Sequence, residues 1–155
     1  MSKVLVACFS ATGTTRRAAE HLAQLAGADL YEIRPETPYT DKDLNYTNPL
    51  SRVTKEFLKR GSYRPPLADH DAPIAEHDTI FLCFPIWYYT APTIISGFLE
   101  QYDFSGKKIV LFATSGGSDL KKCPDTAKKS APNADIVAGC MLSGSLTRTD
   151  IEEFL

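Results

Sequence analysis

Short runs typical of β-strands alternate along this chain with longer stretches of helical periodicity, and this alternation constrains the fold more than any other feature. The segments VLVACF and TIFLCF are apolar almost throughout, which is the pattern of a strand buried on both faces. The five predicted strands are Lys3–Phe9, Asp29–Arg34, Asp78–Pro85, Lys107–Thr114 and Asp135–Leu142.

Helical stretches separate most of these strands. Gly13–Ala26 repeats its apolar residues at helical spacing and is closed by Gly27. Pro92 begins a second helix that continues to Tyr102, and Asp119–Ser130 is a weaker third one. A capping box in Thr149-Asp150-Ile151-Glu152 predicts that a short last helix begins there.

The alternation of apolar strands with helices predicts an α/β fold with a doubly wound parallel sheet. Helices would cover both faces, giving three αβα layers, and the 155 residues would form one domain over 1–155. Right-handed crossovers leave 2-1-3-4-5 as the common order of five strands. Its ligand crevice lies at the carboxyl ends of the first and third strands.

The connection over residues 35–77 is long for a crossover, and it carries six prolines around a short predicted helix at about Ser51–Arg60. It is either a lid over a site or a surface insertion. The last helix has room for only about two turns before Leu155, so the sheet is thinly covered there or the natural chain is longer.

Charge and composition argue against several classes of partner. The net charge is −2 and the basic pairs are scattered, so no nucleic-acid surface is expected. No apolar run is long enough to cross a membrane and no signal peptide is evident, so we expect a cytoplasmic protein. The acidic residues around His70 and His77 read as a solvated loop rather than a metal site.

The four cysteines have no CxxC spacing, which argues against a disulfide framework or a zinc site. Cys8, Cys83 and Cys140 fall in apolar runs and are expected to be buried. Cys123 lies in a polar helical stretch and is predicted to be an exposed thiol.

A hydroxyl-rich turn follows the first strand and opens the first helix. It contains Ser10, Thr12, Gly13, Thr14 and Thr15. The first N–H groups of a helix are free donors, the helix dipole favours an anion, and glycine allows close approach of the backbone. The turn therefore predicts a phosphate site, although it is neither a Walker A loop nor a dinucleotide turn. A capped helix after an ordinary turn is the alternative.

Two further loops follow the third and fourth strands. Pro85-Ile86-Trp87-Tyr88-Tyr89 places three aromatic side chains together, which suggests a platform for a flat ring or an interface, with Trp87 as the favoured ring contact. Thr114-Ser115-Gly116-Gly117-Ser118 offers backbone donors and small side chains that could bind the polar edge of a ring, and Asp119 could cap the next helix. A ligand with a phosphate tail and a flat ring is most simply FMN.

These three loops resemble those of the flavodoxin family, in particular the small bacterial flavodoxin-like proteins. Ser10-x-Thr12-Gly13-x-Thr15 is similar to the family's phosphate signature, Pro85-Ile86-Trp87 to its ring loop, and Thr114-Ser115-Gly116 to the loop that holds the pyrimidine end. The resemblance implies that the first loop holds the FMN phosphate, that Pro85, Ile86 and Trp87 contact the ring, and that Thr114–Ser118 binds its polar edge. Tyr46 or Arg52 could add to the flavin site.

The resemblance implies an electron carrier that shuttles electrons between redox partner proteins, a reductase and an acceptor, as a monomer or weak homodimer. The alternative is an FMN-dependent NAD(P)H oxidoreductase of the quinone or azo type, whose ring loop also resembles Pro85-x-Trp87-x4-Pro92. A flavin-free binding module is a third reading. No side chain is assigned a catalytic role.

Overall fold

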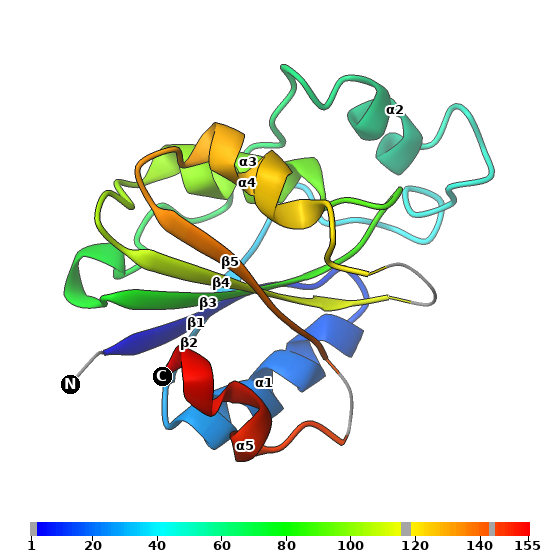
Figure 1. Ribbon diagram of the computed structural model, residues 1–155. Helices are drawn as coiled ribbons and strands as arrows, with labels where there is room; N and C mark the ends of the chain where they lie inside the picture. The colour runs from blue at the N-terminus through cyan, green and yellow to red at the C-terminus, as the bar shows by residue number, and fades with distance from the viewer. Residues whose placement is uncertain (1–2, 116–118, 143–144) are drawn as a thin grey trace.

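Five parallel strands form the sheet at the centre of the molecule, in the order β2-β1-β3-β4-β5 (Figure 1). The computed structural model describes residues 3–115, 119–142 and 145–155. The strands are β1 (Val4–Phe9), β2 (Asp29–Ile33), β3 (Thr79–Pro85), β4 (Lys108–Thr114) and β5 (Asp135–Met141). The predicted fold class and strand order are confirmed.

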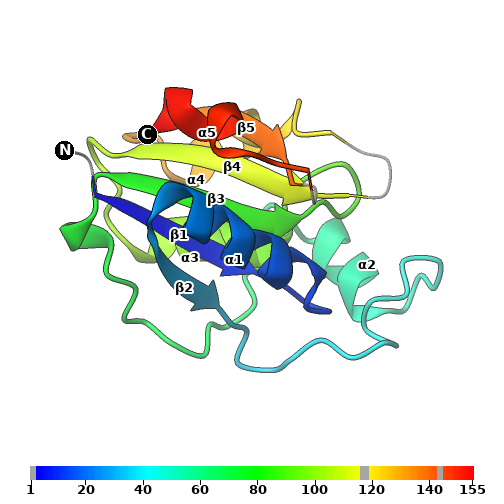
Figure 2. The same cartoon turned by 90° about the horizontal axis from the view of Figure 1, so that it is seen from below.

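Helices cover both faces of this sheet. They are α1 (Thr14–Ala26), α2 (Arg52–Leu58), α3 (Thr93–Gln101), α4 (Cys123–Ser130) and α5 (Arg148–Ile151). Two 3₁₀ turns, Ile74–Glu76 and Glu152–Phe154, complete the set within the described residues. Helices α1 and α5 lie on one face and α3 and α4 on the other, while α2 stands beside the carboxyl ends of the strands (Figures 1 and 2).

The sheet separates two apolar cores, as alternating side chains on buried strands require. In β1, Leu5, Ala7 and Phe9 join the core under α3 and α4. Val4, Val6 and Cys8 face α1 and α5 instead. Every residue of β1 is buried, which is why its sequence is apolar without alternation.

Helix α4 begins four residues later than predicted, at Cys123. The Asp119 carboxylate accepts a hydrogen bond from the Lys121 backbone N–H at 3.0 Å, so it closes a turn before the helix and does not cap it. The predicted exposure of Cys123 is wrong. Its side chain is 1% exposed because Cys123 and Ala127 form the apolar face of α4, and burial raises the pKa of the thiol to about 11.

The capping box of α5 lies two residues earlier than predicted. Thr147, with extended backbone, is the N-cap, and its backbone N–H donates to Asp150 Oδ2 at 2.8 Å. Thr149 lies inside the helix. The predicted N-cap was misplaced because two threonines within three residues offer alternative caps.

The long connection between β2 and β3 is closed at its base by two backbone hydrogen bonds, from Glu36 N–H to the Pro66 carbonyl and from Ala68 N–H to the Arg34 carbonyl, both 2.8 Å. Leu67 and Ile74 then bury their side chains in the core under α3. This part of the connection therefore covers the sheet, where a crossover helix would otherwise lie.

His77 is not part of a solvated patch, contrary to the prediction. It is 2% exposed, with Nδ1 2.7 Å from the Pro73 carbonyl oxygen and Nε2 3.2 Å from Asp29 Oδ2. Among the described residues, no group of three or more His, Cys, Asp or Glu side chains could hold a metal ion. Across the same ranges, no helix has the length and apolar character needed to cross a membrane.

Candidate functional site

The carboxyl ends of β1, β3 and β4 meet at one edge of the sheet, and this brings the three predicted loops together. Pro85 lies opposite Thr114 in the parallel register, and the Ile86 backbone N–H donates to the Thr114 carbonyl at 2.9 Å. The rings of Phe9, the last residue of β1, and Trp87 are 5.6 Å apart, edge to face. A single ligand could therefore contact all three loops.

The first loop has the geometry of an anion site. Gly13 has φ +94°, a left-handed conformation that favours glycine, and its backbone N–H donates to Ser10 Oγ at 3.0 Å. Within the part of the chain that the structure describes, no side chain caps the N-terminus of α1, and its first turn carries no acidic residue. The exposed hydroxyls of Thr12 and Thr14 lie 3.5 Å apart beside it. Free N–H donors and hydroxyls are the donor set that a phosphate needs.

Thr15 links this loop to the end of β4. Its side chain is 2% exposed, and its hydroxyl lies 2.7 Å from the hydroxyl of Thr114. This contact holds the first turn of α1 at a fixed place relative to the third loop. Thr15 therefore has a structural role at the site, because its hydroxyl is hydrogen-bonded to that of Thr114.

Arg17 is a site residue that sequence reasoning missed. A Cβ built on Gly13 would lie 3.5 Å from a terminal nitrogen of Arg17, so the guanidinium reaches back over the hydroxyl-rich loop. Helical side chains lean toward the N-terminus, and this lean was the available signal for a residue in the second turn. Arg16 serves a different role and pairs with Glu20 at 3.2 Å and Glu32 at 3.4 Å.

The second loop is a tight two-residue turn. Trp87 and Thr90 exchange backbone hydrogen bonds of 2.9 and 3.2 Å, with Tyr88 and Tyr89 between them. Both tyrosines have left-handed backbones, with φ of 52° and 68°. Positive φ at both central residues is the geometry of a type I′ turn, which normally takes Asn or Gly, so two tyrosines there hold strained backbone at the candidate site.

The three aromatic side chains of this turn do not form one platform. Trp87 is half-buried and packs edge to face on Phe9 and on Tyr39, whose ring centre is 5.2 Å away. Tyr88 stacks on Phe57 of α2 at 4.5 Å, and Tyr89 is 73% exposed. Trp87 is thus the aromatic residue of the turn that packs on Phe9, next to the hydroxyl-rich loop, and its contact with a ring stays a prediction.

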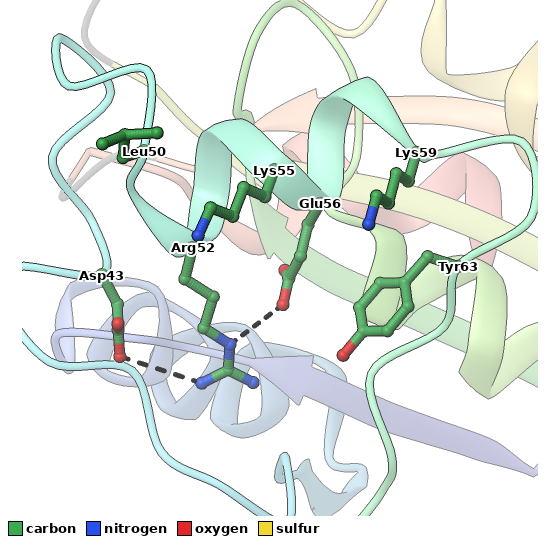
Figure 3. A pocket seen from close by; sticks show the side chains of 7 residues that line it. All are labelled: Asp43, Leu50, Arg52, Lys55, Glu56, Lys59 and Tyr63. Atoms are coloured by element: carbon green, nitrogen blue, oxygen red, sulfur yellow. Dashed lines mark hydrogen bonds and ion pairs between the residues drawn. The ribbon is translucent and has the colours of Figure 1, made fainter.

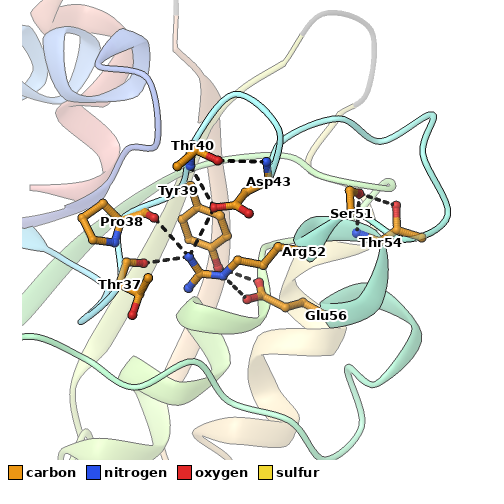
Figure 4. Close-up of polar contacts among 9 residues, drawn as sticks. All are labelled: Thr37, Pro38, Tyr39, Thr40, Asp43, Ser51, Arg52, Thr54 and Glu56. Carbon is orange, nitrogen blue, oxygen red and sulfur yellow. Dashed lines mark hydrogen bonds and ion pairs between the residues drawn. The ribbon is translucent and has the colours of Figure 1, made fainter.

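Tyr39, whose ring packs on Trp87, is held by a polar cluster in the long connection. Figure 4 shows this cluster. The Tyr39 hydroxyl donates to Glu56 Oε1 at 2.5 Å, and Arg52 Nε donates to Glu56 Oε2 at 2.9 Å. The Arg52 guanidinium lies 3.8 Å above the Tyr39 ring and also donates to the Thr37 carbonyl at 2.7 Å. Burial and the hydrogen bond to Glu56 raise the pKa of Tyr39 well above its usual range.

The long connection between β2 and β3 also contacts the aromatic turn directly. The Tyr88 hydroxyl lies 2.7 Å from Thr54 Oγ1 and donates to the Tyr46 carbonyl at 3.3 Å. Two residues were suggested as additional flavin contacts. Arg52 lies in the polar cluster that holds Tyr39. Tyr46 contacts the turn through its backbone carbonyl, and its side chain is 72% exposed.

The third loop is only partly described. Thr114 ends β4 and holds Thr15 and Ile86 as given above, and Ser115 follows it directly. Gly116, Gly117 and Ser118, which were predicted to bind the polar edge of the ring, lie outside the described residues.

A cavity of about 370 Å³ lies between α2 and the neighbouring segments of the long connection (Figure 3). Its lining includes Asp43, Arg52 and Glu56, whose charges are paired with one another at 3.9 Å and 2.9 Å from Arg52. Arg52, suggested as an additional flavin contact, lines this cavity, whereas no described residue of the three predicted loops does. It is a feature of the long connection, separate from the three loops.

Comparison with known proteins gives a consistent picture. A family model described as "Flavodoxin" matches residues 3–155. A solved structure from Bacteroides eggerthii, named "putative flavoprotein", is 41% identical, covers 100% of this chain and 96% of its own, and superposes with a TM-score of 0.92. A flavoprotein from Lactobacillus acidophilus in complex with FMN shares the fold, with 17% identity, a TM-score of 0.74, and coverage of 99% and 97% of the two chains.

A curated relative is larger than this chain. Ribosyldihydronicotinamide dehydrogenase [quinone] of Homo sapiens is 26% identical over 113 residues, which is 59% of this chain and 49% of the human protein. The chain therefore spans about half the length of this relative.

Proposed function

This chain belongs to the flavodoxin family, and from that premise we propose that it binds FMN at the three loops and shuttles electrons between redox partner proteins. The observation that carries the proposal is the uncapped N-terminus of α1, beside Gly13 and tied to the end of β4 by the 2.7 Å contact of Thr15 with Thr114. It supports a phosphate on the first loop and a ring between the second and third. When bound, FMN supplies the redox chemistry, accepting and giving up electrons.

The first loop would hold the phosphate. Gly13 opens the backbone to the anion, the free N–H groups of α1 and the hydroxyls of Ser10, Thr12 and Thr14 donate to it, and Arg17 adds a positive charge. Thr15 positions this donor set through Thr114 and does not need to touch the phosphate with its hydroxyl.

The second and third loops would hold the ring. Pro85 and Ile86 line the strand end, and Trp87 offers an aromatic face or edge that Phe9 and Tyr39 keep in place. Thr114–Ser118 would bind the polar edge of the ring.

A second candidate is an FMN-dependent NAD(P)H oxidoreductase of the quinone or azo type. The match over 113 residues to a human enzyme named as a quinone-reducing dehydrogenase supports this candidate. The chain spans about half of that enzyme. The two candidates differ in whether this chain alone, without a further domain or another protein, turns over a substrate.

FMN binding is the first experiment. Trp87 is the only tryptophan of the sequence, so its fluorescence should be quenched as FMN binds to the apoprotein, with a one-to-one end point. An absence of quenching and of any calorimetric signal would overturn the three-loop assignment.

Turnover separates the two functions. FMN-loaded protein mixed with NADH or NADPH and a quinone should show no steady turnover if it is a carrier, and anaerobic reduction with dithionite should proceed in two separable one-electron steps. Steady turnover without another protein, with reduction in a single two-electron step, would favour the oxidoreductase. Sedimentation of the loaded protein would test the proposed monomer or weak homodimer.

A further inference from the structure

A second cavity lies beside the aromatic turn. Tyr88 and Tyr89 of the second loop line it, whereas no described residue of the first or third loop does. It has a volume of about 620 Å³ and is bounded by α2, the turn at Tyr88 and Tyr89, α3 and α4, which gather at one corner of the molecule (Figure 1). Trp87 is not among its lining residues. This volume is within the usual range for small-molecule sites, about 300 to 1,000 Å³.

Two helices provide a hydroxyl-lined floor. Helix α3 contributes Thr93 and Ser96, one turn apart, and α4 contributes Thr126 and Ser130 at i, i+4 spacing. Repetition at helical spacing puts these small polar side chains on the two facing sides of α3 and α4. The Ser130 hydroxyl already donates to Glu100 and the Thr126 hydroxyl to the Lys122 carbonyl, so Thr93 and Ser96 are the members of this floor that could donate to a ligand.

The Thr93 hydroxyl is the unusual member of this floor. The residue is 7% exposed, and its Oγ1 is a buried side-chain oxygen that has no hydrogen-bond partner among the residues that the structure describes. A buried hydroxyl without a partner costs free energy, so a ligand atom that reached Thr93 from the cavity and accepted its hydrogen bond would recover part of that cost.

The charge of the cavity is positive. Glu100 is already neutralised, because Arg64 donates to both of its oxygens at 2.9 and 3.1 Å and the Ser130 hydroxyl donates at 2.9 Å. Lys122, Lys129 and Arg60 also line the cavity, and within the described part of the chain no carboxylate lies within 4 Å of their charged groups. Three cations of the lining thus have no countercharge among the described residues.

Aromatic side chains complete the lining. Tyr89 is 73% exposed, and Phe57 stacks on Tyr88 at 4.5 Å, so the cavity wall combines flat apolar faces with the cations. The left-handed backbone of Tyr88 and Tyr89 holds these rings at a turn where glycine would be less strained. Two tyrosines at this turn are consistent with a use for their rings.

We propose that this cavity is a second binding site, for a small aromatic anion whose carboxylate or phosphate meets Lys122, Lys129 and the hydroxyl of Thr93 while its ring lies against Tyr88 and Tyr89. The site is separate from the FMN site and does not depend on it. Because it shares the turn with Trp87, a ligand here also touches the loop that would contact the flavin ring.

The test uses 2-naphthoate as the aromatic anion and its uncharged amide, 2-naphthamide, as the matched ligand. Each is titrated calorimetrically into the full chain, with FMN in excess to occupy the proposed flavin site and again without FMN. We expect 2-naphthoate to bind one to one and 2-naphthamide to bind about tenfold more weakly, because charge-assisted hydrogen bonds are the strong ones.

Variants locate the site. Lys129→Met and Lys122→Met should each weaken 2-naphthoate about threefold to tenfold. Lys128→Met is the control, since Lys128 is an exposed neighbour on α4 that does not line the cavity. Thr93→Val keeps the side-chain shape and should weaken the anion while raising the midpoint of thermal unfolding, because it removes an unpaired buried hydroxyl.

Several results would overturn the proposal. One is the absence of 2-naphthoate binding with and without FMN, and another is equal binding in Lys129→Met and Lys128→Met. An unchanged affinity in Thr93→Val with a folded protein would remove Thr93 from the site. If FMN abolishes the binding of 2-naphthoate and Lys129→Met leaves it unchanged, the probe occupies the proposed flavin site instead.

Discussion

The hydroxyls of Thr15 and Thr114 lie 2.7 Å apart, although 99 positions separate the two residues in the sequence. The contact fixes the first turn of α1 against the end of β4, and so sets the distance between the phosphate loop and the loop that follows β4. Thr15 is buried, so water does not compete for this bond.

Thr15→Val keeps the shape of the side chain and removes the bond. We expect the free energy of unfolding to fall by about 1 to 2 kcal/mol, because Thr114 loses its partner in a part-buried place. FMN affinity should fall as well, since the two loops are no longer held together. Denaturant unfolding of Thr15→Val, Thr114→Val and the double variant measures the coupling, and strict additivity of the two single effects would contradict a direct bond.

Arg17→Gln removes the charge that reaches over Gly13. Its FMN affinity should fall about fivefold to tenfold and depend less on salt, because a charged partner of the phosphate is lost. Riboflavin, which has no phosphate, should bind the variant and the parent protein equally.

Arg16→Gln is the matched control for this prediction. Arg16 pairs with Glu20 and Glu32 on the surface, so its loss should leave FMN affinity unchanged. An equal effect of the two substitutions, measured by Trp87 fluorescence, would mean that Arg17 acts only through the net charge.

Tyr39→Phe tests the polar cluster that holds Tyr39. At neutral pH the variant should lose about 1 kcal/mol of stability, since Glu56 keeps Arg52 but loses the phenol donor. The pKa of Tyr39 is raised in the folded state, so above about pH 10 the unfolded chain releases a proton that the folded chain retains.

The parent protein should therefore lose stability as the pH rises above this value, and Tyr39→Phe should lose less of it. Urea unfolding at pH 8, 9.5 and 11 gives the comparison. Parallel curves for the two proteins would show that Tyr39 does not titrate differently on folding.

Thiol labelling tests the burial of the cysteines. Burial raises the pKa of Cys8 to about 12 and that of Cys123 to about 11, and it also raises the pKa of Cys83 well above its usual value. Cys140 is half-buried. At pH 8 we expect one fast-reacting thiol, Cys140, in the folded protein and all four in denaturant, identified by mass spectrometry of the modified peptides. Fast labelling of Cys123 would contradict its place under α4.

Gly139→Ala tests the close contact between β5 and β4. An added Cβ would lie 2.8 Å from the Leu111 carbonyl oxygen and 2.8 Å from a methyl group of Val110. The variant should lose about 1 to 3 kcal/mol of stability through overpacking. Gly61→Ala is the control, because an added Cβ there meets nothing within 4 Å. Equal unfolding midpoints for the two variants would refute the tight contact.

The sequence was informative wherever one local rule decided the structure. Apolar runs predicted the strands because β1, β3 and β4 are buried on both faces, and Gly27 ends α1 with φ 62° as a C-cap glycine does. The three loops could be expected at one edge because parallel strands place their carboxyl ends together.

Tertiary contacts decided the features that sequence reasoning missed. Tyr39 and Glu56 lie in a proline-rich connection without periodicity, so nothing local indicated that they are hydrogen-bonded or that Tyr39 packs on Trp87. Cys123 appeared exposed because its neighbours Lys121 and Lys122 are polar, yet one face of a short helix is enough to bury it. His77 pairs with Asp29, which lies 48 positions away, and the spacing of residues in the sequence does not reveal this pairing.

The order of the strands has a consequence for the growing chain. β1 is complete at Phe9, but its second neighbour, β3, begins at Thr79, so the ribosome must add about half of the protein before the strand is paired on both sides. Until then β1 presents an apolar strand with a free edge, the kind of surface that chaperones bind and that aggregates form from. A chain whose synthesis stops before Thr79 is therefore expected to need such protection, whatever the stability of the finished protein.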